Sequence, residues 1–103
     1  MEKFGLHGKL KATSGNGEQL AQILLEASAL VATAQGCQLY LVSRDDQDID
    51  AVWVTEVWDS KEDHQNSLSL PAVKALIAKA LPILDGRPES GQVLTVLGGK
   101  GIA

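Results

Sequence analysis

The side chains of this chain that could bind and deprotonate a small aromatic molecule are histidine, tryptophan and tyrosine. His64 follows Ser60 near an expected helix start, where the positive end of the helix dipole disfavours the charged imidazolium. A neutral imidazole can accept a proton from a phenol or quinol, which makes His64 the candidate catalytic base. The alternative is a surface histidine that interacts with its sequence neighbours Glu62 or Asp63.

Three of the four aromatic residues lie in two segments that are expected to form central strands: Tyr40, Trp53 and Trp58. Their rings could stack on an aromatic ligand. Large aromatic side chains also serve as core or interface anchors. We expect at least one of the three to line a ligand cavity.

The remaining reactive side chains point to no second chemistry. His7 lies beside Lys9 and Lys11, which favours a solvated position or the rim of a dimer interface. The two histidines lie in separate elements without a ligand-pair spacing, so no metal site is predicted. Cys37 has no neighbouring base and is expected to be a small buried hydrophobic residue.

Composition sets the class of protein. A length of 103 residues predicts a single domain over residues 1–103. The net charge of −4 argues against nucleic-acid binding, and no apolar run approaches the roughly 20 residues that span a membrane. A single cysteine cannot build a disulfide framework, so the reducing cytoplasm is the expected location.

Hydrophobic periodicity predicts the order β-α-β-β-α-β. Alternating apolar residues indicate strands, and apolar residues at three- and four-residue spacing indicate amphipathic helices. This order is typical of the α+β ferredoxin-like fold, a four-stranded antiparallel sheet with two helices on one face. The expected strands cover residues 4–12, 37–43, 51–58 and 93–97, and the apolar stripes of the expected helices cover residues 20–34 and 73–81.

Local signals fix the expected ends of the helices. Asn16 with Gln19 forms a capping-box pattern before the first helix, and Gly36 is expected to end that helix. Ser60 is the expected cap of the second helical region, and Pro71 suits the first turn of a further helix. Pro82 and the sequence at 86–88 break that helix, 44–50 is an expected polar loop, and 98–103 is an expected tail, either flexible or crossing to a partner.

The third strand is apolar on both faces. Val52, Val54 and Trp58 point one way, and Trp53, Thr55 and Val57 point the other way. Two helices can cover only one face of the sheet, so a second copy of the chain is expected to cover the other. Association through this face would bury Trp53 or Trp58.

Several segments resemble the antibiotic-biosynthesis-monooxygenase-like family of dimeric α+β barrels. They are EVWDSKEDH, SLSLPAVKAL, GKLKATSGNGEQL and the closing GGKG. The resemblance implies a homodimer whose sheets face each other, with a ligand cavity in each protomer between sheet and helices. It also implies oxygenation of quinols or polycyclic aromatics without a cofactor.

The chain departs from this family at two positions. Better-known members often carry later histidines where this chain has Ser67 and Ala72, which gives Ser67 an expected place among the ligand-lining residues. The asparagine, tryptophan and histidine set of the haem-degrading branch has no counterpart here, so no haem role is expected.

The leading hypothesis is an oxygenase that acts on a reduced aromatic without metal or flavin, with His64 as the base. Trp53, Trp58, Tyr40 and Ser67 would line the ligand cavity. The alternative is a non-catalytic or stress-related dimer that binds a small apolar metabolite. A third hypothesis, a purely structural interaction module, predicts no cavity.

Overall fold

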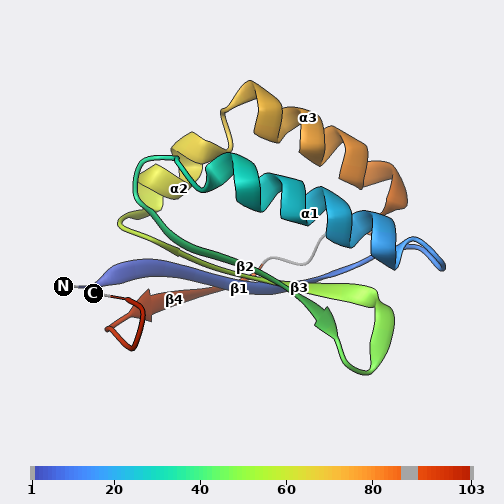
Figure 1. Ribbon diagram of the computed structural model, residues 1–103, viewed down its shortest axis with the longest axis horizontal. Helices are drawn as coiled ribbons and strands as arrows, with labels where there is room; N and C mark the ends of the chain where they lie inside the picture. The colour runs from blue at the N-terminus through green and yellow to red at the C-terminus, as the bar shows by residue number, and fades with distance from the viewer. Residues whose placement is uncertain (1, 87–90, 103) are drawn as a thin grey trace.

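The computed structural model describes residues 2–86 and 91–102 as a four-stranded antiparallel sheet with helices on one face (Figure 1). The strands are β1 (Lys3–Lys11), β2 (Cys37–Asp45), β3 (Asp48–Trp58) and β4 (Gln92–Val96), in the order β2-β3-β1-β4. The helices are α1 (Gly17–Val31), α2 (Lys61–Ser67) and α3 (Pro71–Ala80), followed by the 3₁₀ turn η1 (Leu81–Ile83). The predicted ferredoxin-like α+β fold is confirmed, with the second helical region divided into α2 and α3.

The alternation of the strands decides which side chains meet the helices. Phe4 lies opposite Trp58, and Leu10 lies opposite Val52, in the pairing of β1 with β3. These pairs face the helices, where Val52 and Trp58 are completely buried. Apolar side chains thus form two core clusters, one around Leu20, Val52 and Leu76 and the other around Val31, Trp58 and Val73.

The connection between β2 and β3 is shorter than the polar loop predicted over 44–50. The two strands extend to Asp45 and from Asp48, so only Asp46 and Gln47 remain between them. The acidic side chains make the turn: the Asp45 carboxylate accepts from the Gln47 amide at 2.8 Å, and Asp48 accepts from the Asp50 amide at 3.0 Å. The acid-rich composition therefore reflects local turn bonding and not a long solvated loop.

The expected capping box at the start of α1 is wrong. The Asn16 side chain makes no cap bond and donates instead to the Thr13 hydroxyl at 2.6 Å. The Asp50 carboxylate, at the start of β3, accepts from the amides of Gly15 and Gly17 at 3.3 and 3.0 Å. Asp50 therefore satisfies amides at the helix start and also joins α1 to the sheet.

Asp50→Ala is expected to lower the free energy of unfolding by about 1–2 kcal/mol, because the amides of Gly15 and Gly17 at the helix start lose the carboxylate that accepts their hydrogen bonds. Chemical denaturation measures this change. Asp85→Ala is the matched control, because Asp85 is exposed. Equal stabilities of the two variants would contradict the capping role of Asp50.

The other helix boundaries follow the sequence signals in part. Ser60 caps α2 by accepting from the Asp63 amide at 3.1 Å, and Pro71 opens α3. Helix α1 ends at Val31, earlier than the pattern predicted, and Gly36 closes the following turn with φ +82°. A side chain at Gly36 would also collide with Asp63 of α2, so glycine permits this close approach.

The C-terminal segment folds into a short turn within the described residues. The Ile102 amide donates to the Gly99 carbonyl at 3.1 Å, which closes a turn in the segment that was expected to be a tail. Residues 87 and 88 of the predicted helix break lie outside the described residues. In the described ranges, no helix is both long enough and apolar enough to span a membrane.

Candidate functional site

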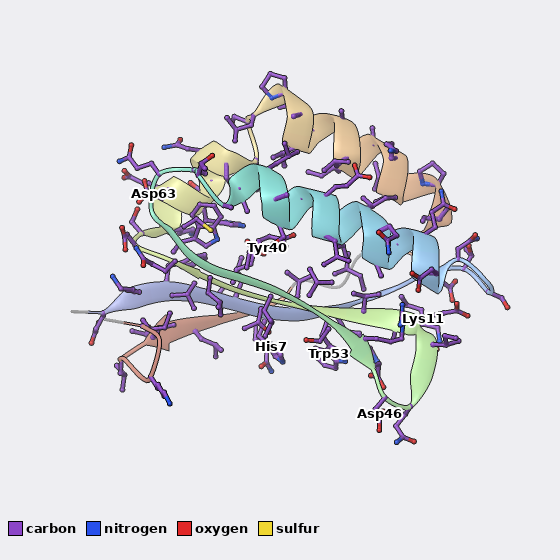
Figure 2. All side chains as sticks on the ribbon, in the orientation of Figure 1. His7, Lys11, Tyr40, Asp46, Trp53 and Asp63 are labelled. Atoms are coloured by element: carbon purple, nitrogen blue, oxygen red, sulfur yellow. The ribbon has the colours of Figure 1, made fainter. Side chains whose placement is uncertain are left out.

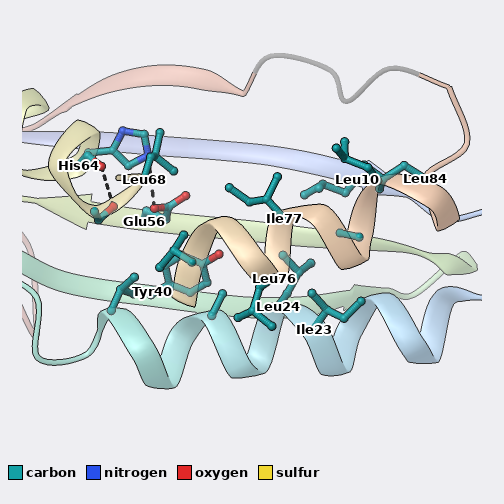
Figure 3. A pocket seen from close by; sticks show the side chains of 16 residues that line it. Leu10, Ile23, Leu24, Tyr40, Glu56, His64, Leu68, Leu76, Ile77 and Leu84 are labelled. Atoms are coloured by element: carbon teal, nitrogen blue, oxygen red, sulfur yellow. Dashed lines mark hydrogen bonds and ion pairs between the residues drawn. The ribbon is translucent and has the colours of Figure 1, made fainter. Parts of the chain in front are cut away.

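A cavity of about 250 Å³ lies between the sheet and the helices (Figure 3). Most of its wall is apolar and comes from α1, α3 and the chain after α3, including Ile23, Leu24, Ala27, Leu76, Ile77, Ala80 and Leu84. Four lining side chains carry polar groups: Tyr40, Glu56, His64 and Ser67. A partly open, largely apolar space with a few polar groups is the usual form of a small-molecule site, and its presence contradicts the structural-module hypothesis, which predicts no cavity.

The polar groups gather at one end of the cavity, where β2, β3 and α2 meet (Figure 3). Tyr40 of β2 lies directly opposite Glu56 of β3 in the sheet register. His64 Nε2 lies 3.8 Å from Glu56 Oε1, and both side chains are only 15% exposed. The pair is therefore a nearly buried carboxylate and imidazole that face a ligand-sized space.

Aromatic contacts fix the orientation of the His64 ring. The ring lies 5.5 Å from the Phe4 ring and meets the Trp58 indole edge-on at 5.8 Å, measured between centroids. Ser67 adds a bond from its hydroxyl to the His64 carbonyl at 2.6 Å, within α2. The imidazole is thus held in one place by packing from β1 and β3 and by its own short helix.

Glu56 is the buried charge of the site. Burial raises the pKa of its carboxyl group, although the hydrogen bond from Trp58 Nε1 at 3.0 Å and the nearby His64 act in the opposite direction. Burial and the same carboxylate also raise the pKa of the Tyr40 phenol, so Tyr40 stays a neutral hydrogen-bond donor. The polar end therefore combines a carboxyl group that is costly to ionise, an imidazole and a phenol.

The structure brings three of the predicted site residues together. His64, Tyr40 and Ser67 all line the cavity. Trp58 lies behind the cavity wall, completely buried within the chain, and contacts the site through His64 and Glu56. Trp53 is not brought to this cavity.

Trp53 lies on the opposite face of the sheet together with His7, whereas Tyr40 lies between the sheet and the helices (Figure 2). The rings of His7 and Trp53 stack with centroids 5.0 Å apart, and the Trp53 indole donates to Asp45 at 2.9 Å. His7 Nδ1 lies 2.9 Å from the Thr55 hydroxyl. These residues form a separate aromatic and polar group on the face that has no helices.

The sequence interpretation missed Glu56. It considered Glu62 and Asp63 as the acidic partners of His64, whereas the carboxyl group that faces the imidazole, that of Glu56, comes from β3. The signal was present, because strand alternation places Glu56 on the same face as Val54 and Trp58. An acidic residue in the middle of a buried strand face is uncommon and therefore points to a site.

The arrangement is suited to proton transfer at the edge of an apolar space. An imidazole that accepts a proton beside a carboxylate is stabilised in its charged form, and the low-polarity surroundings strengthen that interaction. Among the described residues, no group of three or more histidine, cysteine, aspartate or glutamate side chains is placed to hold a metal ion.

Comparison with known proteins identifies relatives of the whole fold. The crystal structure of a "putative Antibiotic biosynthesis monooxygenase" from Chloroflexus aurantiacus J-10-fl is 40% identical, with a TM-score of 0.87 over 98% of this chain and 99% of that one. A protein of the same description from Caulobacter crescentus CB15 is 22% identical, with a TM-score of 0.83 over 92% and 90% of the two chains. One from Nitrosomonas europaea is only 8% identical, yet its TM-score is 0.86 over 92% of this chain and 90% of that one.

No curated protein matches the chain. The family model for antibiotic biosynthesis monooxygenases matches residues 4–79, which include the polar end of the cavity and nearly all of β1 and α3. This match and the similar structures support a general monooxygenase-like role. The chain belongs to the antibiotic biosynthesis monooxygenase family.

Proposed function

We propose that this protein is a cofactor-independent monooxygenase that acts on a quinol or another reduced aromatic molecule. The observation that carries the proposal is the Glu56 and His64 pair at one end of an apolar cavity. A phenolic ring seated there would place its hydroxyl group at the imidazole and its carbon skeleton against apolar walls. Oxidation of such a ring by dioxygen starts with loss of the hydroxyl proton.

In the proposed reaction His64 accepts the phenolic proton, and Glu56 stabilises the resulting imidazolium. The phenolate is electron-rich and reduces dioxygen, which then bonds to a ring carbon that carries hydrogen. Cleavage of the oxygen–oxygen bond leaves one oxygen atom on that carbon as a carbonyl. The other oxygen leaves as water with the phenolic hydrogen and the ring hydrogen, so atoms and electrons balance without another reductant.

The polar side chains that do not move protons would orient the ring. The neutral phenol of Tyr40 is available to donate a hydrogen bond to a second oxygen of a quinol. The buried Trp58 holds both members of the pair, since its indole donates to Glu56 and packs against His64. The apolar wall keeps water away from the reduced oxygen species.

Oxygen-electrode assays test this function directly. With a panel of hydroquinones, we expect enzyme-dependent oxygen uptake with one dioxygen consumed per ring, because each ring gains one oxygen atom. Isotopically labelled dioxygen should place one labelled atom in the product. Thermal stabilisation by the same compounds without oxygen uptake would contradict the proposed monooxygenase activity. It would support the alternative, a protein that only binds a small apolar molecule.

We also propose that the protein forms a homodimer through the face of the sheet that has no helices. Leu41 and Leu94 are 50% and 47% exposed, and their strand partners Thr55 and Gly5 place them on this face. The stacked His7 and Trp53 rings lie there too (Figure 2). A sheet face that exposes leucine side chains beside stacked aromatic rings is suited to packing against a partner surface.

A further inference from the structure

We infer that the natural substrate is a phenol or quinol that carries an alkyl chain, with its ring at Glu56 and His64 and its chain along α1 and α3. This inference rests on the proposed function for the position of the ring. It adds a second recognition element, a hydrocarbon tail, that a compact fused-ring substrate lacks.

The first support is the division of the cavity into two chemically different parts. The polar side chains all lie at the end formed by β2, β3 and α2, whereas Leu10 and Leu84 lie at the other end (Figure 3). The wall follows α1 from Val31 to Ile23, a length of about 12 Å at 1.5 Å per residue. A single hydroxylated ring at the polar end would leave the apolar part of this length unfilled.

The second support is the apolar surface at the opening of the cavity. Leu68, Ile77 and Leu81 line the cavity and are 43%, 43% and 55% exposed. Ile77 belongs to α3 and Leu81 to η1, whereas Leu68 follows α2 and lies beside His64 at the polar end (Figure 3). A chain longer than the cavity could therefore continue over the exposed side chains of Ile77 and Leu81.

Wild-type protein and a series of hydroquinones with methyl, butyl, hexyl and octyl substituents provide the primary test. Binding is measured by calorimetry without oxygen, so that turnover does not interfere. We expect the affinity to rise by about fourfold per added methylene group until the apolar part is full, the factor typical of burying one such group. A naphthohydroquinone without a chain is the compact comparison and should bind more weakly than the hexyl compound.

Ala27→Leu tests the position of the chain. Ala27 lines the cavity between the Val31 and Ile23 positions of α1, and leucine is well tolerated in helices. The larger side chain should lower the affinity for the octyl compound by about tenfold or more, since it displaces two to three methylene groups. The methyl compound should lose much less affinity.

Ala29→Leu is the matched control, because Ala29 lies on the exposed side of the same helix and does not line the cavity. It should bind every compound as the wild type does. A flat affinity across the alkyl series, or a tighter fit for the fused-ring compound, would overturn the inference. In that case the oxygen-uptake assay would still test the proposed function independently. Conversely, affinity that rises with chain length but without any oxygen uptake would reject the proposed reaction and still support an alkyl-substituted phenol or quinol as the ligand.

Discussion

Glu56→Gln is expected to lower hydroquinone-dependent oxygen uptake by about 100-fold, the lower end of the range typical of positioned acid–base groups. Glutamine keeps an oxygen that can accept from Trp58 Nε1, so the local packing is preserved. It carries no charge to stabilise the imidazolium of His64, which lies 3.8 Å away. The rate constant under saturating substrate is the measurement, with binding followed separately.

Glu62→Gln is the matched control, because Glu62 is an exposed acid of the same α2 helix that holds His64. It should leave oxygen uptake unchanged. His64→Gln should be at least as slow as Glu56→Gln, and the double variant should be no slower than His64→Gln alone. Two residues that act as one unit give this non-additive result, whereas multiplied losses would contradict a shared proton-transfer role.

Glu56→Gln is also expected to change the stability of the fold, in a direction that depends on pH. Burial raises the pKa of Glu56 in the folded protein, so ionisation of this group destabilises the fold. The wild type therefore loses stability relative to Glu56→Gln as pH rises through the folded pKa. Below the ordinary carboxyl pKa the group is protonated in both states, and this penalty disappears.

Thermal denaturation over a pH series should therefore show Glu56→Gln to be the more stable protein near neutral pH. The wild-type rate should fall as pH drops through the same raised pKa, because the reaction needs the ionised carboxylate. A variant that was both less active and less stable at neutral pH would indicate a structural role for Glu56 and not a catalytic one.

The fold was predictable because its signals are local. The alternation along 51–58 placed Val52 and Trp58 on one face and Trp53 on the other, and the structure has that division. Ser60 and Pro71 marked their helix starts correctly, since a side-chain cap and a proline act within one turn.

Two of the errors concern interactions between distant parts of the chain. The cap of α1 comes from Asp50, which lies 33 residues from Gly17, and no pattern around Asn16 could show it. The pairing of Glu56 with His64 depends on how α2 crosses the end of β3, although the position of Glu56 on the strand was readable. Alternation placed Trp53 and Trp58 on opposite faces of the sheet, but it could not tell which face the helices cover. The packing of the helices decides this: Trp58 lies behind the cavity and Trp53 lies on the open face.

Leu41→Asp is expected to convert the proposed dimer into monomers at micromolar concentration. Leu41 is 50% exposed on the open face of the sheet, and a specific dimer typically buries about 800 Å² of each partner in an interface of this type. A carboxylate placed there would be desolvated without a partner, which costs several kcal/mol. Sedimentation equilibrium of wild type and variant is the measurement.

Leu25→Asp separates an interface effect from a general effect of adding charge. Leu25 is 48% exposed on α1, so it matches Leu41 in exposure but lies in the helical layer. This variant should remain dimeric. Val54→Asp is a second comparison, because Val54 is only 7% exposed under the helices and its replacement should unfold the protomer instead of dissociating it. A wild-type protein that sediments as a monomer would reject the proposed homodimer. A Leu41→Asp variant that is folded but monomeric, beside a dimeric wild type, would identify the sheet face that carries Trp53 as the dimer interface.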